Sequence, residues 1–495
     1  MCMTRSVKLE PAASAAPATR IVRYGGTKKL CLLLLLFVVP IRRPSVPDQF
    51  MTLSPNGKYL VNTFTNKPVF MTGEDAWELI TELSNADVET YLADRAKRGF
   101  DVVWAAAADN VYQSNPPQDY YGNVPFDGAD FTNEDPSYWA HVDDVLQRAA
   151  AYKVTVMLDP AFVGLDPPSG YFTSYENSSD AVMTAYGTWL GNRYKNFPNV
   201  IWALGGDADP YYANIYTKLS DLATGLAVAD TNHLITFEAS RYTQNGGGGL
   251  APGGGYSSLD VWPGPPSWLG LNWVYQTQPT VVSGCQSNYL RSPWLPPLMG
   301  EDWYELENNM TEFQVRQEGY WEVLSGCYLG RLFGNNSIWS FNSPNGENPG
   351  APSWQSQLGS PGSVAQEYLG QLMRTREHWL LVPDITNLVL TGGYGSGATL
   401  SVAARTSDGQ TIIAYFSDGN ATVKTINMSM ITSPSSAARA WWYNPQTSAT
   451  TLIGVFPNSG SQNFTAPDGN DWVLVIDNAS AHLPQPGSKS LAFPY

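Results

Sequence analysis

The chain has 495 residues, about three times the ~150 residues of a typical domain, which favours either several domains or one large barrel with an addition. With 43% hydrophobic residues, 15% charged residues, 17 Trp, 27 Tyr and 18 Phe, the composition excludes a disordered chain, which would be poor in aromatic residues, and a coiled coil, which would be rich in charge. The net charge of −16 would repel phosphate backbones, so nucleic acid is not an expected partner.

Residues 1–45 are predicted to be a leader. A twelve-residue apolar run, Leu30 to Ile41, follows the basic residues of positions 20–29. A basic flank before a short apolar run is typical of a signal peptide, and the run is shorter than the ~20 residues of a membrane-spanning helix. Arg42 and Arg43 stand where small residues would precede cleavage, so an uncleaved anchor is the alternative and the one membrane contact expected. We expect a secreted or cell-envelope, extracellular protein.

After an N-terminal hairpin at 59–73, short apolar runs alternate with stretches of helical periodicity. The expected strands are 68–72, 101–107, 153–159, 200–206, 233–239, 268–274, 296–301 and 337–342. The expected helices are 84–98, 137–152, 179–195, 210–229, 276–290, 310–329 and 363–381. This order predicts an α/β fold of the (β/α)8, or TIM-barrel, type over residues 46–385. A doubly wound sheet is the alternative, but no glycine-rich dinucleotide fingerprint follows an early strand.

Near residue 385 the pattern changes to strands at short spacing with no helical stretch. The expected strands are 387–391, 398–404, 411–416, 421–427, 438–443, 450–454 and 472–476. Turn sequences such as SDG at 407–409 and PDG at 467–469 separate some of them. The pattern predicts a small antiparallel β-sandwich over residues 386–482, followed by a tail at 483–495.

Cysteine and histidine usage gives little sign of a metal centre. Beyond the leader, Cys285 and Cys327 remain, and they could form one disulfide or two buried thiols. Neither lies in a CxxC or Cys/His spacing, and the chain has four His, so no zinc site is indicated.

The polar residues at the expected strand ends are mostly acids and aromatic residues. Functional residues of a (β/α)8 barrel gather at the C-terminal ends of its strands. The candidates there are Asp75, Trp77, Asp109, Asp159, Asp207, Glu238, Glu301, Tyr304 and Trp339. Asp75, Asp109 and Asp159 could equally be structural hydrogen-bond acceptors. Glu238 could pair with Arg241, and Trp339 could belong to the core.

This residue set fits glycoside hydrolysis. One carboxylic acid protonates the leaving oxygen, a second carboxylate attacks the anomeric carbon or activates water, and aromatic rings hold the sugar. Among the barrel histidines, His141 lies in an expected helix and His233 begins an expected strand, so no Ser-His-Asp set is evident. Metal binding by the same acids is the alternative, but no DxDxDG ligand spacing occurs, so neither a metal nor another cofactor is expected.

Asp207 and Glu301 are the strongest candidates for the catalytic pair. They follow glycines at the ends of the fourth and seventh expected strands, where the backbone can turn sharply and present an acid. The alternatives are that Asp207 caps the next helix and that Glu301 forms a salt bridge. We expect both carboxyls to flank one glycosidic bond at the mouth of the barrel.

Five segments carry a resemblance to a known family. They are LSPNGKYLVNTFTNKPVFMTGEDAWEL (53–79), YLADRAKRGFDVV (91–103), FPNVIWALGGDAD (197–209), PLMGEDWYE (297–305) and GYWEVLSGCYLGRLFGNNSIWSF (319–341). Together the chain resembles the apiosidase-like glycoside hydrolases over roughly residues 50–480. WWYNPQTSAT (441–450) fits the C-terminal sandwich of that family, which is labelled collagen-binding.

The resemblance implies a fold and a chemistry. It implies a (β/α)8 barrel with Asp207 as the acid/base and Glu301 as the nucleophile, acting on an oligo- or polysaccharide side chain such as apiose, a branched pentose of pectin. The family motif G-D-T-A-W is replaced here by Gly73-Glu74-Asp75-Ala76-Trp77. A non-catalytic carbohydrate- or matrix-binding protein on the same barrel is the alternative function, and the oligomeric state is not indicated by the sequence.

Overall fold

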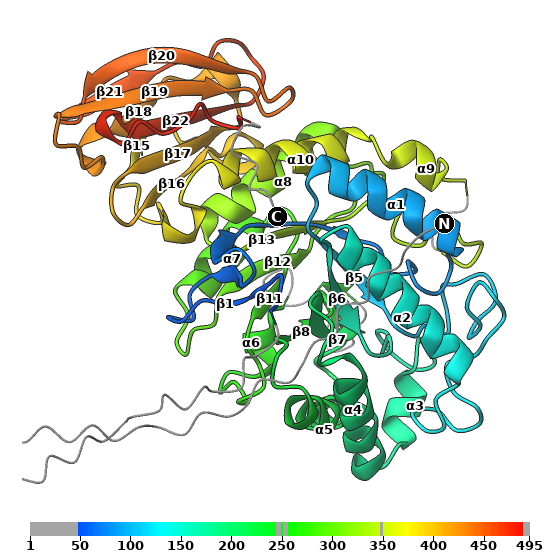
Figure 1. Ribbon diagram of the computed structural model, residues 1–495. Coiled ribbons are helices and arrows are strands. Elements are labelled where there is room, and N and C mark those ends of the chain that lie inside the picture. Colours follow the sequence, from blue (N-terminus) through cyan, green and yellow to red (C-terminus); the bar gives the residue numbers. More distant parts are fainter. Residues whose placement is uncertain (1–47, 244–248, 251–255, 347–349, 489–495) are drawn as a thin grey trace, which may run out of the picture. The chain divides into compact units, whose positions relative to one another are not determined.

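The computed structural model describes residues 48–243, 249–250, 256–346 and 350–488, and it confirms the (β/α)8 barrel followed by an antiparallel sandwich (Figure 1). The barrel strands are β4 (Met71–Asp75), β5 (Val102–Ala106), β6 (Thr155–Asp159), β7 (Val200–Ala208), β8 (Ile235–Ala239), β11 (Asn272–Tyr275), β12 (Pro297–Glu301) and β13 (Gly330–Phe333). They form one parallel sheet in the order β11-β12-β13-β4-β5-β6-β7-β8. A bridge between Ile235 and Leu269 brings β8 beside the segment before β11, so the sheet curls into a barrel.

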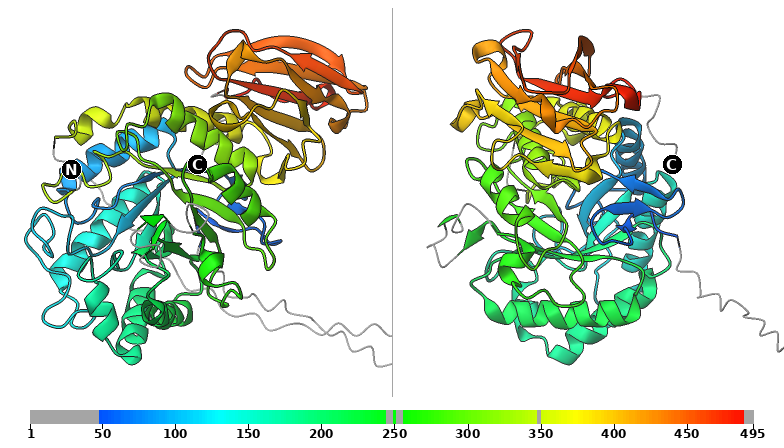
Figure 2. Two further views of the ribbon diagram at one scale, coloured as in Figure 1. Left: turned by 180° about the vertical axis from the view of Figure 1, so that it is seen from behind. Right: turned by 90° about the vertical axis from the view of Figure 1, so that its left-hand side faces the viewer.

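Helices cover the outside of the barrel (Figures 1 and 2). They are α1 (Asn85–Arg98), α2 (Pro136–Ala151), α3 (Phe172–Asn177), α4 (Asp180–Tyr194), α5 (Ala213–Ala229), α6 (Ser258–Val261), α7 (Val281–Tyr289), α8 (Glu312–Ser325), α9 (Trp354–Gln357) and α10 (Pro361–Arg374). Their ends follow local sequence signals. Ser84 Oγ accepts from Asp87 N at 3.2 Å to begin α1, and Gly99 at φ 81° ends it.

The barrel strands are buried on both faces, which explains their continuous apolar runs. Every residue of β4, β5, β6 and β8 is buried. Parallel strands covered by helices have no solvent-facing side, so they do not alternate between apolar and polar residues. Acids that occur in such strands are therefore placed in the interior at the cost of desolvation.

Two expectations at the ends of the barrel need correction. The N-terminal hairpin is a three-stranded antiparallel sheet of β1 (Thr52–Leu53), β2 (Leu60–Asn62) and β3 (Lys67–Val69), and the first barrel strand begins at Met71. The eighth strand is β13 at 330–333, paired with β12 and β4, and not 337–342. Residues 337–342 form turns, and all of them except Asn342 are buried; Trp339 N donates to Asn335 O at 3.1 Å. Their apolar composition reflects this burial and not a strand.

The sandwich consists of a six-stranded and a three-stranded antiparallel sheet. The first has the order β14-β16-β17-β22-β19-β20 and the second β15-β18-β21. The strands are β14 (Leu381–Pro383), β15 (Leu390–Gly392), β16 (Val402–Thr406), β17 (Thr411–Phe416), β18 (Lys424–Asn427), β19 (Ala437–Tyr443), β20 (Thr450–Pro457), β21 (Ser461–Phe464) and β22 (Trp472–Asn478). The short strands β14 and β21 were not expected from the sequence.

Cys285 of α7 and Cys327 are joined in a disulfide, so the alternative of two free thiols is wrong. The bond closes a loop of sequence separation 42 that contains β12 and α8. Such a link stabilises the fold chiefly by restricting the unfolded chain.

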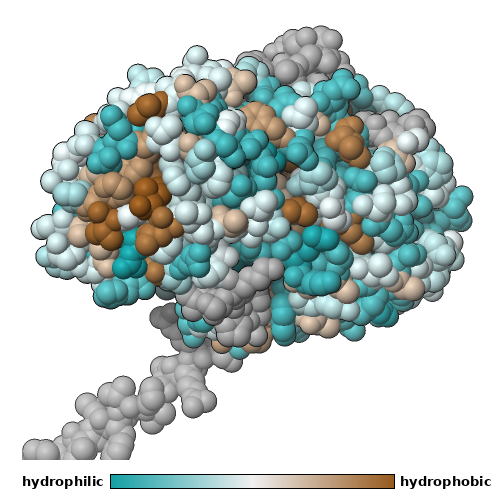
Figure 3. Space-filling view, turned by 90° about the horizontal axis from the view of Figure 1, so that it is seen from above, coloured by the Kyte–Doolittle hydropathy of each residue, from teal (hydrophilic) through white to brown (hydrophobic). Residues whose placement is uncertain are grey.

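The predicted leader lies outside the described residues. Among those residues, no helix is both long and apolar enough to cross a membrane. In the view of Figure 3, hydrophobic residues gather at the left, and the rest of the face is largely hydrophilic. The sandwich exposes Leu452 and Val455 on β20, the last strand in the order of its sheet, to 51% and 59%. Exposed apolar residues on an edge strand favour contacts with other chains.

Candidate active site

A cavity of about 200 Å³ lies at the carboxyl ends of the barrel strands. Its lining residues are Trp77, Tyr112, Phe162, Leu165, Ser169, Asp207, Arg241, Tyr275, Glu301, Tyr304, Glu307, Asn336 and Trp339. These residues lie at or shortly after the carboxyl ends of most of the barrel strands, so the cavity is the mouth of the barrel. Five of the predicted site residues are among them, including both members of the predicted catalytic pair.

The end of β7 turns Asp207 into the cavity. Gly205, Gly206 and Asp207 have φ values of 116°, 55° and 57°, a left-handed run that shifts the register between β7 and β8. A Cβ on Gly205 would lie 2.2 Å from Glu238 O, and one on Gly206 would lie 2.5 Å from the Phe162 ring. Only glycine fits either position, and an aspartate held at positive φ is typical of a functional site.

The end of β12 presents Glu301 from another side of the cavity. A Cβ on Gly300 would lie 2.0 Å from the Trp273 ring, so the glycine lets the strand pass directly against this tryptophan. Glu301 is 5% exposed, and that small exposed part lines the cavity.

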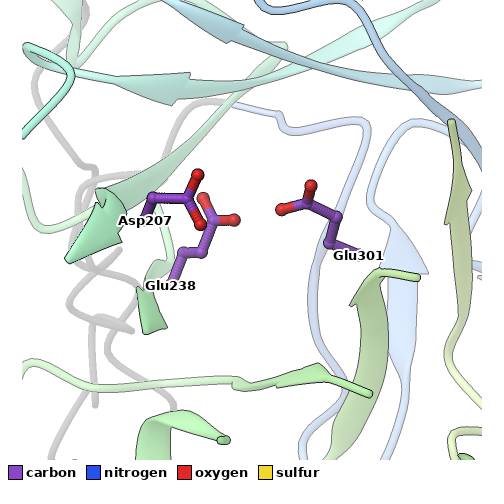
Figure 4. A group of neighbouring side chains, drawn as sticks. All are labelled: Asp207, Glu238 and Glu301. Atoms are coloured by element: carbon purple, nitrogen blue, oxygen red, sulfur yellow. The ribbon is translucent and has the colours of Figure 1, made fainter. Parts of the chain in front are cut away.

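Asp207, Glu238 and Glu301 form one carboxylate cluster. Each offers one oxygen, and these oxygens all lie within 4.8 Å of one another. Figure 4 shows Asp207 and Glu238 on one side and Glu301 pointing toward them from the other. Glu238, from β8, is completely buried and does not line the cavity. The fold therefore brings together three acids that are separated by up to 94 positions in the sequence.

The acids of this cluster have different electrostatic surroundings. Burial raises the pKa of Glu238 well above its usual value, and the negative charges of Glu301 and Asp207 raise it further. Burial also raises the pKa of Glu301, but hydrogen bonds from Glu238, Tyr275 and Tyr304 and the charge of Arg241 oppose this rise. The surroundings of Glu238 thus favour its protonated form, whereas the neighbours of Glu301 favour its ionised form.

Arg241 provides positive charge beside this cluster. Its guanidinium carbon lies 3.7 Å from the ring centroid of Trp303, and Nη2 lies 3.6 Å from Glu307 Oε1. The same three carboxylates are close enough together to ligate a divalent cation. A guanidinium that already balances Glu301 disfavours a second cation there, so the geometry fits proton chemistry better.

Aromatic rings form one wall of the cavity. Trp77 Nε1 donates to Tyr304 Oη at 3.0 Å, which fixes both side chains. The rings of Trp77 and Trp339 are 5.9 Å apart, and those of Tyr112 and Trp339 are 5.0 Å apart. Such rings provide apolar faces on which a sugar can stack.

The comparisons with known proteins agree with this geometry. Residues 54–380 match the family described as "Apiosidase-like, catalytic domain", and residues 382–477 match "Putative collagen-binding domain of a collagenase". The chain belongs to the apiosidase-like family. Its barrel is the catalytic domain of a glycosidase.

Two solved structures share this domain arrangement. One, described as a glycoside hydrolase, is 25% identical with a TM-score of 0.73 and covers 88% of this chain and 97% of its own. The other, a family 5 glycoside hydrolase from Bacteroides vulgatus ATCC 8482, is 24% identical with a TM-score of 0.72 and covers 87% and 93%. No curated protein matches the chain.

Besides Glu238, three predicted site residues of this apiosidase-like glycosidase do not line the cavity. Asp75 is 1% exposed, and burial and the charge of Glu301 raise its pKa well above the usual value. Asp109 accepts from Tyr112 N at 3.0 Å, and burial raises its pKa to about 6. Asp159 is completely buried beside Gly206. Asp75 thus lies next to the nucleophile candidate, whereas Asp109 holds the loop that carries Tyr112.

The family motif departs at Glu74 and Asp75, and the structure gives the two acids different surroundings. Glu74 Oε1 accepts from Arg95 at 2.9 Å and Oε2 accepts from Tyr91 Oη at 2.6 Å, so this acid is a structural partner of α1. Asp75 is the acid of the motif that lies beside Glu301.

Sequence reasoning missed several cavity residues. Tyr275 is the last residue of β11 and directly follows the expected strand 268–274. Arg241 comes two residues after β8, and Tyr112 comes six after β5. Reading beyond the last strand residue would have found Tyr275. Asn336 gave no signal, because the eighth strand was placed too late in the chain.

Proposed function

We propose that this glycosidase cleaves an oligo- or polysaccharide by a two-carboxylate, retaining mechanism, with Asp207 as acid/base and Glu301 as nucleophile. The observation that carries the proposal is the meeting of these two acids in one cavity, with one carboxylate oxygen of each no more than 4.8 Å from one of the other. Retaining enzymes hold their carboxyls ~5–5.5 Å apart, and inverting enzymes hold them ~6.5–9.5 Å apart to admit a water. The short separation favours retention.

In the first step, a Glu301 oxygen attacks the anomeric carbon while Asp207 donates its proton to the leaving glycosidic oxygen. The bond to the leaving group breaks and an ester to Glu301 forms. In the second step, Asp207 takes a proton from water, the water oxygen attacks the anomeric carbon, and Glu301 leaves as a carboxylate. Tyr275, Tyr304 and Arg241 stabilise the carboxylate in its ionised form.

The cavity supports a small, neutral sugar at the reacting position. Its volume of about 200 Å³ lies below the ~300–1,000 Å³ of typical ligand pockets, so it fits one sugar residue. Asp207, Glu301 and Glu307 outnumber Arg241 among its charged lining residues, which disfavours an acidic sugar there. Both features agree with a terminal side-chain sugar of a plant or microbial polysaccharide, such as apiose.

We also propose that the enzyme acts outside the cytoplasm, in the extracellular space or at the cell envelope. The Cys285–Cys327 disulfide supports this, because such bonds persist in oxidising compartments.

A covalent trap tests the mechanism. The purified enzyme is screened on aryl glycosides and pectic oligosaccharides, and the anomer first released is identified by NMR. The matching 2-fluoro glycoside is then added, and the labelled peptide is located by mass spectrometry. We expect retention and a label on Glu301. An inverted first product, or a label on another residue, would refute the assignment.

Two alternatives have their own outcomes in the same assay. A carboxylate–metal hydrolase would lose activity to a chelator and regain it with a divalent cation. A binding protein would retain pectic oligosaccharides without releasing reducing sugar.

A further inference from the structure

Helix α8 is enclosed along most of its length. Residues 315–325 are all buried, although the helix contains Arg316, Glu318 and Glu322. A helix on the outside of a barrel normally leaves one face in water. Here the barrel covers one side, and strands of the sandwich, β14, β16 and β17, contact another.

The sandwich holds α8 by polar contacts with good geometry. Arg316 donates to both oxygens of Asp471, at 2.8 and 2.7 Å, and Tyr415 Oη donates to the same carboxylate at 2.9 Å. The rings of Tyr320 and Tyr415 stack with centroids 4.8 Å apart and an interplanar angle of 2°. Trp321 Nε1 donates to Leu400 O at 2.8 Å. A buried, bidentate pair of this kind fixes orientation as well as distance.

On the barrel side, α8 contacts Arg331 of β13. Arg331 Nε lies 2.9 Å from Glu322 Oε2, and Nη1 donates to Val315 O at 3.2 Å. A Cβ on Gly319 would lie 2.8 Å from Arg331 Nη1, so the helix backbone packs directly on the guanidinium. Any movement of α8 therefore moves Arg331.

Arg331 in turn reaches the residue next to the proposed nucleophile. Its Nη2 forms a buried ion pair with Asp302, which directly follows Glu301 at the end of β12. Asp302 is 1% exposed and Arg331 is 2% exposed, so water screens this pair weakly. The charges of Glu301 and Asp302 both act on Asp75, so without the guanidinium Asp302 would add an unbalanced negative charge to the group of acids around Glu301.

We propose that the sandwich is a supporting part of the active site: it holds α8, α8 holds Arg331, and Arg331 neutralises Asp302 beside Glu301. Asp302 and Arg331 are positioning residues, because they act through Glu301. The inference rests on the proposed function in taking Glu301 as the nucleophile. It gives the sandwich a role in turnover of small substrates, which an independent binding module would not have.

The chain offers a matched pair of variants. Asp471→Asn weakens the pair that holds α8. Asp477→Asn weakens an equally buried bidentate pair, to Arg376 at 2.8 and 2.7 Å, which does not involve α8. The two acids are 2% and 3% exposed, so both variants should lose similar stability. The pH profile of kcat/KM is measured on an aryl glycoside, well below the melting temperature of each variant.

We expect Asp471→Asn to lower kcat roughly 10- to 100-fold, because small displacements of a nucleophile are costly. The acidic limb of the kcat/KM profile of Asp471→Asn should move up by about half to one pH unit. The reason is that Asp302 is less well neutralised, so Glu301 becomes harder to ionise. Asp477→Asn should stay within about twofold of the wild type. Asp302→Asn should move the acidic limb down, because it leaves Arg331 without the opposing charge.

Equal kinetics in Asp471→Asn and Asp477→Asn would overturn the inference. If Asp471→Asn does not fold, Trp321→Phe, which removes one hydrogen bond to the sandwich, takes its place. Its kcat should fall about 2- to 5-fold with the same direction of pH shift, and no change would be equally decisive. Amide hydrogen exchange in β12 and β13 should rise in Asp471→Asn but not in Asp477→Asn. That measurement needs no turnover, so it separates failure of this inference from an inactive wild type, which would instead refute the proposed function.

Discussion

The mouth of the barrel and the sandwich differ in the partners of their buried acids. In the sandwich, two buried acids have close cationic partners: Asp471 with Arg316 at 2.7 Å and Asp477 with Arg376 at 2.7 Å. At the mouth of the barrel, Glu238 and Glu301 lie against each other and against Asp207, with Arg241 beside them. Paired charges of the first kind hold a fold together, whereas crowded acids of the second kind shift pKa values away from their usual range.

This difference separates the two ways in which a substitution can act. Neutralising an acid at the mouth relieves repulsion and removes chemistry. Neutralising one partner in the sandwich leaves the other charge buried and alone. The first change should therefore affect activity without affecting stability. The second should lower stability, and it should affect activity only where the pair holds α8, as Asp471 and Arg316 do.

The largest effect is expected for Glu301→Gln and Asp207→Asn. Each should lower kcat/KM by on the order of 10,000-fold, the scale of removing a group that bonds to or protonates the substrate. Thermal unfolding should occur at the same or a higher temperature, because one of several crowded acids becomes neutral. The value of kcat/KM is measured on the best aryl glycoside, and the unfolding temperature is measured by calorimetry. A variant that loses both activity and stability would show that the acid is structural.

The next largest effect is expected for Arg376→Met, which removes the partner of Asp477 in the sandwich. It leaves Asp477, which is 3% exposed, without the bidentate partner that Arg376 provides. We expect the free energy of unfolding to fall by about 3–5 kcal/mol, with kcat/KM at a permissive temperature close to that of the wild type. Urea denaturation gives the first quantity. A stability equal to the wild type would mean that this pair contributes nothing.

The mouth of the barrel was also the part that the sequence predicted best. The sequences Gly205-Gly206-Asp207 and Gly300-Glu301 indicate site residues locally. A glycine before an acid at a strand end allows the backbone to turn or pack closely and so present the acid. Seven of the eight barrel strands were recognisable as apolar runs between helical stretches. The eighth was not, because β13 has four residues and the buried turn after it, with Trp339, has a more strand-like composition.

Long-range contacts were not predictable in this way. Nothing near Arg241 in the sequence indicates that it stacks on Trp303, and Arg331 gives no sign that it meets Asp302 and α8. The sequence of α8 also gives no sign that Glu318 and Glu322 are completely buried. Burial of a polar helix face depends on a second domain, and periodicity in one segment carries no information about it.

The smallest effect tests a residue between the two regions, Glu318 of α8. Burial, and then the charge of Asp302, raise its pKa well above the usual 4.5. Between 4.5 and that raised pKa, the unfolded chain has released the proton that the native state keeps, so the wild type loses stability as pH rises. Below 4.5 both states are protonated and this loss vanishes.

Glu318→Gln has no proton to lose, so its stability relative to the wild type should increase by about 1.4 kcal/mol per pH unit in that window. Chemical denaturation at pH 5 and pH 6 measures the difference, with Glu312→Gln on the exposed first turn of the same helix as control. Parallel curves for Glu318→Gln and the wild type would place Glu318 with the paired acids of the sandwich and not with the proton-holding acids of the barrel.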